Sequence, residues 1–237
     1  MIHFTASSIE KQLIEANNEL KGVVDYPDEK LLKIIKEVGF ECDLCGRCCT
    51  KEFNDHIFLL DRDTARIKDI NSSALMPAPY YEFCDQNGKF YVSGFALNTK
   101  PDGSCVFLIS GRCEIYDMRP AICRLYPYML HREADENGNI EWRQISGLNE
   151  HGNYHTEIDD TGCEWIADAI KKYETEYLKQ KIRFLRKVQK HFKTNGLKHV
   201  QRIYDRQMRE FLKGGEIEVF VFFEGEFESL KLKNRPV

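Results

Sequence analysis

Apolar residues in the first 40 positions recur every three or four residues, which is the period of an amphipathic helix. One series consists of Ile9, Leu13, Ala16 and Leu20, and a second consists of Leu31, Ile34, Ile35 and Val38. Pro27 precedes the second series and Gly39 follows it, and these residue types commonly begin and end a helix. The pattern therefore predicts a pair of helices over residues 1–39.

Between residues 40 and 163 the apolar runs become short and are separated by turn residues. Asn87–Gly88 stands between two such runs and predicts a β-hairpin, and Asn137–Gly138 repeats the signal. Further short runs predict strands at 58–60 and 105–109 and a helix that is capped by Asp61 and reaches Ile70. This region is expected to form a small mixed β core.

Helical periodicity returns over residues 164–192 and again over 200–211, and the tail at 217–223 alternates like a strand. A strand that follows two helices can pair back with an earlier sheet, so we expect the end of the chain to pack on the core. The sequence thus predicts an α+β protein in three segments. They are a helical pair at 1–39, a cysteine-rich core at 40–163, and long helices with a final strand at 164–237.

Cysteine is the residue type that departs from an ordinary composition. The chain has nine cysteines in 237 residues, and four of them fall within residues 42–49. The N-terminus lacks the basic segment and apolar stretch of a secretory signal, so we expect a reducing, cytoplasmic location. Clustered thiols in such a compartment bind metal or carry out redox chemistry. No apolar run approaches the roughly 20 residues of a membrane helix, so we expect no membrane association.

The spacing of the four clustered cysteines favours one kind of metal site. They run as C-x2-C-x2-C-C from Cys42 to Cys49, with Gly46 to allow a tight turn. Three thiolates at this spacing and one remote cysteine hold a [4Fe–4S] cluster in bacterial ferredoxins, whereas structural Zn2+ sites more often use two separated pairs. We expect Cys123 as the remote ligand. Cys48 and Cys49 point apart in an extended chain, so one of them can instead bind a second metal, bridge or pack.

Three sequence elements occur in a fixed order within residues 40–127. They are C-x2-C-x2-C-C, then C-x-F-L, then G-x-C-x-I-Y-x-x-R-P-x-x-C-R-x-Y-P. This series resembles the YkgJ-like family of cysteine-cluster proteins, which are described as zinc- or iron-chelating. The resemblance implies seven metal ligands, namely Cys42, Cys45, Cys48, Cys49, Cys105, Cys113 and Cys123. Flagellin lysine methylases are similar in their cysteine motif, which implies an alternative function as a cluster-dependent transferase acting on protein lysine.

Arginines flank the later cysteines and can offset the charge of clustered thiolates. Arg112, Arg119 and Arg124 are the candidates, and we expect Arg119 and Arg124 to contact the cofactor. Two cysteines stand outside the motif. Cys84 lies in a predicted strand and is expected in the core. Cys163 lies near the start of a predicted helix, where the pKa of a thiol is lowered, and it stays an alternative ligand.

An enzyme would need further polar groups beside the metal. The candidates are Tyr116, His151, His155, Asp159 and Asp160. Surface positions without a functional role are the favoured interpretation of the two histidines. No G-x-G-x-x-G, P-loop or G-x-S-x-G sequence occurs, so nothing indicates a nucleotide site or a serine hydrolase.

The net charge of −4 conceals a basic segment. Residues 171–213 carry 14 Lys or Arg but only 4 Asp or Glu. A solvated helix face is the favoured explanation, and an acidic partner or substrate protein is the alternative; nucleic acid is not expected, because no recognised motif occurs. The sequence as a whole predicts a cytoplasmic metal-binding protein that carries a [4Fe–4S] cluster for redox or cluster-dependent chemistry. A zinc-binding structural or interaction module is the remaining alternative.

Overall fold

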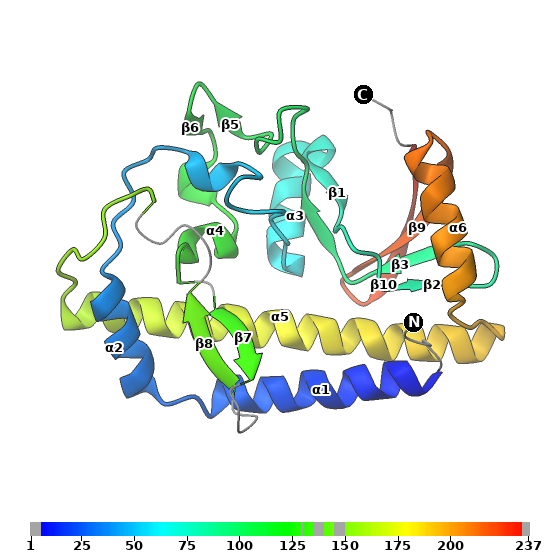
Figure 1. Ribbon diagram of the computed structural model, residues 1–237, viewed down its shortest axis with the longest axis horizontal. Coiled ribbons are helices and arrows are strands. Elements are labelled where there is room, and N and C mark those ends of the chain that lie inside the picture. The colour runs from blue at the N-terminus through cyan, green and yellow to red at the C-terminus, as the bar shows by residue number, and fades with distance from the viewer. Residues whose placement is uncertain (1–5, 129, 135–139, 145–149, 234–237) are drawn as a thin grey trace. The chain divides into compact units, whose positions relative to one another are not determined.

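The helical patterns at both ends of the chain form helices where the sequence predicts them (Figure 1). The computed structural model describes residues 6–128, 130–134, 140–144 and 150–233. Its α-helices are α1 (Ala6–Val24), α2 (Asp28–Val38), α3 (Asp61–Asn71), α4 (Ala121–Leu125), α5 (Asp160–Asn195) and α6 (Gln201–Leu212), with 3-10 turns η1 (Arg47–Cys49), η2 (Ser72–Ala74) and η3 (Tyr116–Met118). Within this described part of the chain, no helix combines the length and the apolar character that crossing a bilayer requires.

Short strands make up the β part of the structure. The described strands are β1 (Leu75–Pro77), β2 (Phe83–Cys84), β3 (Phe90–Val92), β4 (Phe95–Leu97), β5 (Leu108–Ile109), β6 (Arg112–Cys113), β7 (Leu130–Ala134), β8 (Ile140–Gln144), β9 (Glu216–Phe223) and β10 (Glu226–Lys233). They form a four-stranded sheet in the order β10-β9-β3-β2 and the pairs β1-β4, β5-β6 and β7-β8. The predicted α+β class is confirmed.

The chain divides into two units, each assembled from distant stretches of sequence. The first unit consists of residues 1–18, 60–96 and 178–237, and the second consists of residues 19–59 and 97–177. The divisions fall inside α1 and α5, so each of these helices contributes residues to both units.

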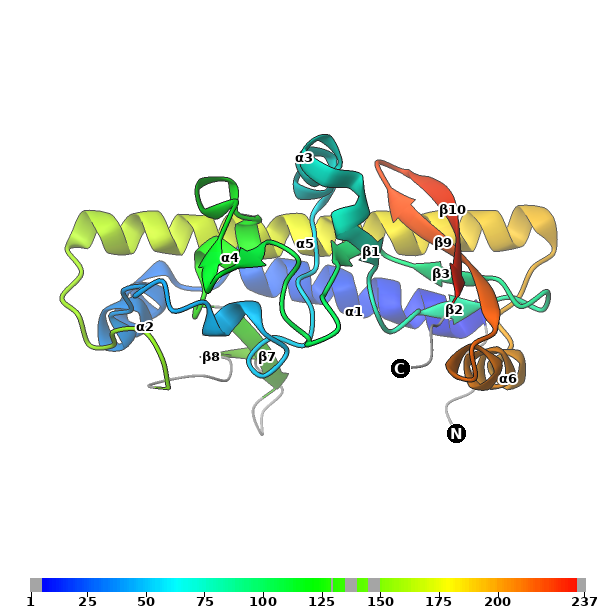
Figure 2. The ribbon, with the colours of Figure 1, turned by 90° about the horizontal axis from the view of Figure 1, so that it is seen from above.

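The sheet of the first unit joins the tail of the chain to its middle. β3 pairs parallel with β9, which places Phe90 opposite Val219 and Val92 opposite Val221. These four side chains are buried. The expectation that the tail strand pairs back with an earlier strand is therefore confirmed. β9 continues into the antiparallel β10, and α6 lies beside β2 and β9 (Figures 1 and 2).

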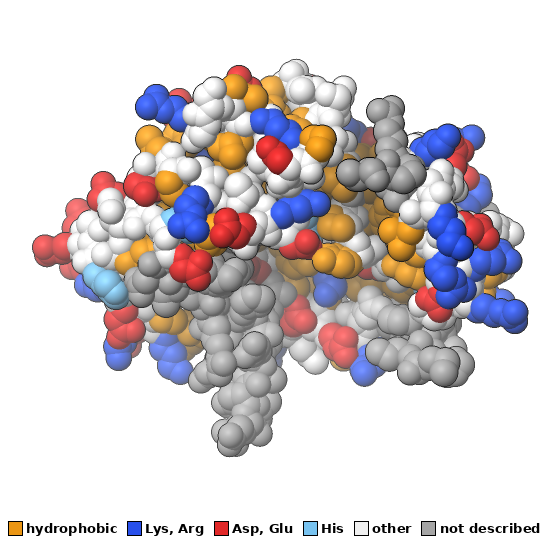
Figure 3. Space-filling view, turned by 45° about the horizontal axis from the view of Figure 1, so that its top comes forward, with side chains coloured by type: hydrophobic (Ala, Val, Ile, Leu, Met, Phe, Trp, Pro, Cys, Tyr) orange, Lys and Arg blue, Asp and Glu red, His pale blue; other side chains and the backbone are white. Residues whose placement is uncertain are grey.

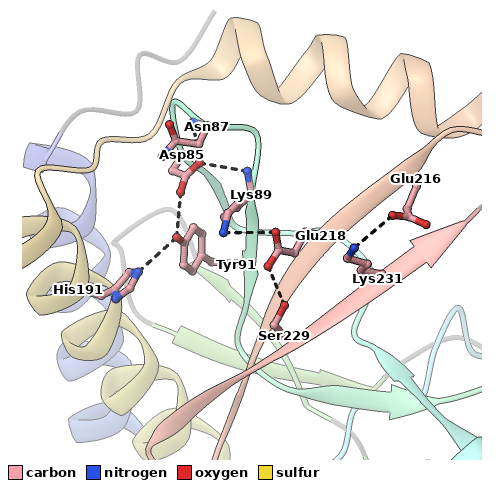
Figure 4. A network of polar contacts seen from close by, with 9 residues as sticks. All are labelled: Asp85, Asn87, Lys89, Tyr91, His191, Glu216, Glu218, Ser229 and Lys231. Carbon is pink, nitrogen blue, oxygen red and sulfur yellow. Dashed lines mark hydrogen bonds and ion pairs between the residues drawn. The ribbon is translucent and has the colours of Figure 1, made fainter.

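A buried polar network closes the turn between β2 and β3 (Figure 4). Asp85 accepts hydrogen bonds from the backbone N–H groups of Asn87 (2.8 Å) and Lys89 (3.1 Å) and from the hydroxyl of Tyr91 (3.0 Å). The Tyr91 oxygen also lies 3.4 Å from Nε2 of His191 in α5. These bonds satisfy a carboxylate that is only 1% exposed. The antiparallel pairing of β2 with β3 confirms the hairpin predicted around Asn87.

The second unit contains the segments that carry the motif cysteines. α2 ends at Gly39, whose φ of 49° lets its N–H bond to the carbonyl of Ile35, as predicted for this glycine. The chain then passes through residues 42–49, which lie beside the β5-β6 pair and α4 (Figure 1).

Some details between residues 58 and 144 differ from the prediction. Residues 58–60 are buried, but only Phe58 forms a β-bridge, because burial of apolar side chains does not by itself supply a partner strand. Asp61 is the first residue of α3 and not its cap. Of the predicted strand at 105–109, Leu108–Ile109 pairs with β6, and Cys105 forms an isolated β-bridge with Thr99. The turn at 137–138 lies outside the described residues, although β7 and β8 on either side of it pair antiparallel.

Candidate metal centre

Two distant stretches of the second unit meet around one cavity of about 320 Å³. The N–H of Cys105 donates to the carbonyl of Cys49 (2.8 Å), and Thr50 and Ser104 form a β-bridge. Six of the seven motif cysteines line this cavity, namely Cys42, Cys48, Cys49, Cys105, Cys113 and Cys123. The structure thus brings the early cysteine run and the later set to one place, as the sequence predicts.

The backbone of the early run turns tightly at Gly46. This glycine has a φ of 73°, and its carbonyl accepts the N–H of Cys49 (3.0 Å) at the start of η1. A Cβ atom at this position would lie 2.9 Å from the carbonyl oxygen of Gly111 and 2.9 Å from Cδ1 of Leu108. Only glycine therefore allows both the turn and the close approach of the β5-β6 hairpin.

Separate elements hold the three later cysteines. Cys105 precedes β5, Cys113 lies in β6, and Cys123 lies in α4. Pro120 stands immediately before α4, and its carbonyl accepts the N–H groups of Cys123 (3.0 Å) and Arg124 (3.3 Å). The single turn of α4 therefore fixes the position of Cys123 at the cavity.

The surroundings of four of the cavity thiols favour their protonated form when no metal is present. A hydrogen bond with Cys48, followed by burial, raises the pKa of Cys49. Burial raises the pKa of Cys105 to about 11, and it also raises the pKa values of Cys113 and Cys123. Metals bind the thiolate form, so binding must release protons from these groups. Most of the remaining wall is apolar and includes Leu44, Ile57, Leu97, Phe107, Ile115 and Ile122.

Arg119 is the arginine that acts most directly on the cysteines. Its guanidinium lies 3.6 Å from the ring centroid of Tyr116, and both residues line the cavity. Its positive charge opposes the rise in the pKa of Cys49 and Cys123. Arg124 is exposed and donates from Nε to the carbonyl of Arg119 (3.0 Å) and from a terminal nitrogen to that of Asp117 (3.1 Å). Contact of Arg119 and Arg124 with a cofactor stays a prediction.

Cys45 is the motif cysteine that does not line the main cavity. It lines a second, adjoining cavity of about 170 Å³, whose wall also includes Cys42, Cys48 and Cys123. Its sulfur lies 3.7 Å from Nδ1 of His151. The wall of the second cavity therefore contains the polar side chain of His151 as well as cysteines of the motif.

His151 is buried, so the expectation that it lies at the surface is wrong. Nε2 lies 2.7 Å from the hydroxyl of Tyr126, whose ring stacks on the imidazole, and Phe53 packs edge-on against the same ring at 4.7 Å. Burial lowers the pKa of His151. No local pattern could have shown this, because its contacts lie 25 and 106 residues away in the sequence.

Three of the other candidate polar residues, His155, Asp159 and Asp160, do not line either cavity. His155 is exposed, as expected, and its Nδ1 lies 3.1 Å from the carbonyl of Glu37. Asp159 accepts the N–H of Gly162 (2.7 Å), and the exposed Asp160 pairs with Lys36. Tyr116 is therefore the candidate that, besides His151, lines a cavity shared with the cysteines.

The two cysteines outside the motif do not line either cavity. Cys84 is buried in β2, in agreement with the expectation of core packing. Cys163 is also buried, and its sulfur points to the carbonyl of Ile158 (3.7 Å). The expectation of a lowered pKa at Cys163 is wrong, because burial raises the pKa and the positive charge of Lys36 opposes this rise only in part.

The arrangement of the cysteines suits a metal cofactor that several of them bind together. In the described part of the chain, no three His, Cys, Asp or Glu side chains already form a site for a single metal ion. The six cysteines instead surround a common space that is large enough for several water molecules. Thiolates are ligands for zinc, copper(I) and iron–sulfur groups, so the chemistry of the donor set fits such a cofactor.

Comparison with known proteins supports metal binding. Residues 41–146 match the family model CxxCxxCC, which is described as "Putative zinc- or iron-chelating domain". An uncharacterized protein of Methanocaldococcus jannaschii is 30% identical over 94 residues, which cover 38% of this chain and 46% of that protein. The match thus spans less than half of this relative, and no solved structure matches the chain. Residues 41–146, which carry the ordered cysteine motifs, are therefore similar to this family of zinc- or iron-chelating domains, as the sequence predicts.

Proposed function

We propose that the protein binds a [4Fe–4S] cluster in the cavity of the second unit and uses it in redox or cluster-dependent chemistry. One observation carries this proposal. Six cysteines from two distant stretches of chain line a single cavity. The expected ligands are Cys42 and Cys123, which line this cavity, Cys45, which lines the adjoining second cavity, and one or both of Cys48 and Cys49. Such a cluster supplies one-electron transfer, or a Lewis-acidic iron where one coordination position is open.

The size of the cavity and the ligand spacing favour a cluster over zinc. A single Zn2+ ion needs four donors at about 2.3 Å if all are thiolates, and it would occupy only a part of a 320 Å³ space. The C-x2-C-x2-C spacing with a remote cysteine is the arrangement used by ferredoxins. The guanidinium of Arg119 lies beside the ring of Tyr116, and its positive charge partly offsets the negative charge of clustered thiolates.

A reducing compartment such as the cytoplasm is part of this proposal. The nine cysteines are all free thiols, and every one of them lies in the described residues. Several of these thiols line one cavity, and in an oxidising environment neighbouring thiols would form disulfides. A partner protein with an acidic surface is proposed for the basic helices. Lys and Arg side chains gather over α6 (Figure 3), where Arg202, Arg206, Arg209 and Lys213 follow one another at helical spacing.

Analysis of iron and acid-labile sulfide in anaerobically purified protein tests the cluster. We expect near-stoichiometric amounts of both, a brown protein, and visible absorption that bleaches on reduction. Colourless protein that contains one zinc ion and no sulfide, after anaerobic reconstitution has been attempted, would overturn the proposal in favour of the zinc module.

A cluster-dependent enzyme is the second candidate, and the second cavity favours it. This cavity adjoins the cysteines and also holds His151, Tyr126 and the exposed Trp165, so a substrate there would contact both the cluster and polar groups. Cyanide, which binds an iron with an open position, is a suitable probe. A change in the electron paramagnetic resonance spectrum of the reduced cluster on adding cyanide would support an open iron. An unchanged spectrum would favour electron transfer alone.

A further inference from the structure

The second unit contains an open groove of about 610 Å³ that the proposed metal centre does not use. Its wall comes from residues 40–41, from residues 156–159 and from Ile166 in α5. All of these residues belong to the second unit, and none of them is a cysteine. The groove is therefore a feature of one unit, and what it binds does not depend on the nature of the metal.

The backbone along the groove is only partly hydrogen-bonded. Glu41 and Asn153 exchange two N–H···O bonds (2.8 and 2.9 Å), and the N–H of Thr156 donates to the carbonyl of Gly39 (2.8 Å). Beyond this point, the N–H groups of Glu157 and Ile158 and the carbonyl of Glu157 have no hydrogen-bond partner among the described residues. Glu157 is exposed. Open backbone groups on an accessible stretch can pair with the main chain of an added peptide.

The side chains of the groove are acidic and apolar. Its charged residues are Glu41, Glu157 and Asp159, and all three are exposed, so a ligand in the groove can reach them. In the described part of the chain, the side chains of Glu41 and Glu157 form no ion pair or hydrogen bond. The half-buried Phe40, Ile158 and Ile166 supply apolar surface beside these carboxylates. No Lys or Arg lines the groove, so its charge favours a cationic ligand.

We propose that this groove binds an extended segment of a partner protein that carries lysine or arginine beside apolar residues. Its basic side chains would pair with Glu41 and Glu157, and its main chain would bond to the open backbone groups at 157–158. An open groove suits a peptide more than a small molecule, because sites for small molecules enclose most of the ligand. The groove shares Phe40 and Ile166 with the second cavity, so the bound segment would lie beside the cysteines.

Calorimetric titration of the full chain with a short capped peptide of alternating lysine and valine tests the groove. The same peptide with glutamate in place of lysine is the control probe. We expect the basic peptide to bind about tenfold more tightly than the acidic one, and its affinity to fall as salt is added. Glu157→Gln should weaken binding of the basic peptide by about threefold. Glu29→Gln changes an exposed carboxylate of α2 that does not line the groove, and this matched control should leave the affinity unchanged.

Reversing the charge of the groove gives a second test, whose expected result a loss of folding could not produce. The double variant Glu41→Lys with Glu157→Lys should bind the acidic peptide more tightly than the basic one, while circular dichroism shows that the helices are retained. The proposal is overturned if both peptides bind the unchanged chain equally well, if Glu157→Gln keeps full affinity, if the double variant still prefers the basic peptide, or if neither peptide binds at millimolar concentration.

Discussion

Nδ1 of His151 lies 3.7 Å from the sulfur of Cys45, a residue 106 positions earlier in the chain. On the other side of the ring, Nε2 lies 2.7 Å from the hydroxyl of Tyr126. Burial lowers the pKa of His151, so the ring is neutral near pH 7 and carries one N–H. A metal-bound thiolate only accepts hydrogen bonds. In the loaded protein, we therefore expect the proton on Nδ1, with the Tyr126 hydroxyl donating to Nε2.

The first prediction is that His151→Ala lowers the reduction potential of the bound cluster. A hydrogen bond to a thiolate ligand stabilises the reduced state, which carries more negative charge, and its loss therefore favours oxidation. A difference of about 1 kcal/mol between the two oxidation states corresponds to roughly 40 mV for one electron. Redox titration followed by visible absorption measures the shift.

His155→Asn is the matched control for this experiment. His155 lies four residues away, is exposed, and has a φ of 59°, which asparagine tolerates. Its imidazole does not line either cavity. A potential that shifts equally in both variants, or in neither, would show that the contact between His151 and Cys45 does not tune the cluster.

A second prediction distinguishes cysteines at the cavity from those outside it. Serine at Cys42 or Cys123 should remove most of the iron, because each is a proposed ligand whose residue lines the shared cavity. Cys163→Ser is the control, since this cysteine is buried elsewhere in the second unit. Iron per chain, measured after identical anaerobic reconstitution, is the readout. If the Cys123→Ser variant binds as much iron per chain as the unchanged protein, the early and late cysteines do not form one metal site.

The meeting of the two cysteine stretches could be predicted, because the chemistry requires it. A thiolate cluster needs several ligands, and the 42–49 run is completed most simply by the set that ends at Cys123. Gly39 likewise has a local signature, since it ends a helix. Each of these predictions depends on residues that are close in the sequence or share one chemical function.

His151 and Glu82 could not be predicted, and the reason is physical. The ring of His151 packs against Phe53 and Tyr126, and the carboxyl of Glu82 has a buried Oε2 and accepts the N–H of Ser93 at Oε1. Nothing in the neighbouring sequence distinguishes either residue from an exposed one. The sequence does not indicate β10 for a related reason, because this strand pairs with β9 but contains no buried residue and so lacks a continuous apolar pattern.

The third prediction concerns the dependence of stability on pH. The folded state raises the pKa of Glu82 from 4.5 to about 7, so between these values the folded chain holds more protons than the unfolded chain. The free energy of unfolding should therefore fall as the pH rises from about 5 to 7 and should change little from this group above 7. The contribution is on the order of 2–3 kcal/mol.

Urea unfolding at pH 5, 6, 7 and 8 checks this prediction. Glu82→Gln removes the titrating group, so the difference in stability between the variant and the unchanged chain should grow in favour of the variant across this range. Glu224→Gln should follow the unchanged chain, because its carboxylate is exposed. Parallel curves for Glu82→Gln and the unchanged chain would exclude a buried, protonated carboxyl at this position.

A fourth prediction is that metal orders the two cysteine stretches together. The N–H of Cys105 bonds to the carbonyl of Cys49, so loosening of one stretch removes a partner from the other. Removing the metal with a chelator should accelerate amide hydrogen exchange over 42–50 and 105–123 in parallel. The sheet formed by β3 and β9 in the first unit serves as the internal reference and should keep its protection. Unchanged exchange at both cysteine stretches would contradict the coupling.

The last prediction compares two glycines that share a backbone conformation. Gly46 has a φ of 73° and Gly111 a φ of 76°, so alanine at either position should cost about 1–2 kcal/mol through backbone strain. A Cβ atom at Gly46 would also lie 2.9 Å from the carbonyl oxygen of Gly111, whereas one at Gly111 would meet nothing within 4 Å. Gly46→Ala should therefore lose roughly 1–3 kcal/mol more than Gly111→Ala in urea unfolding of the metal-free chain. It should also bind less iron, because the early run could no longer lie against the β5-β6 hairpin. Equal losses in both variants would mean that strain alone, and not the close approach of the two stretches, explains the need for glycine at position 46.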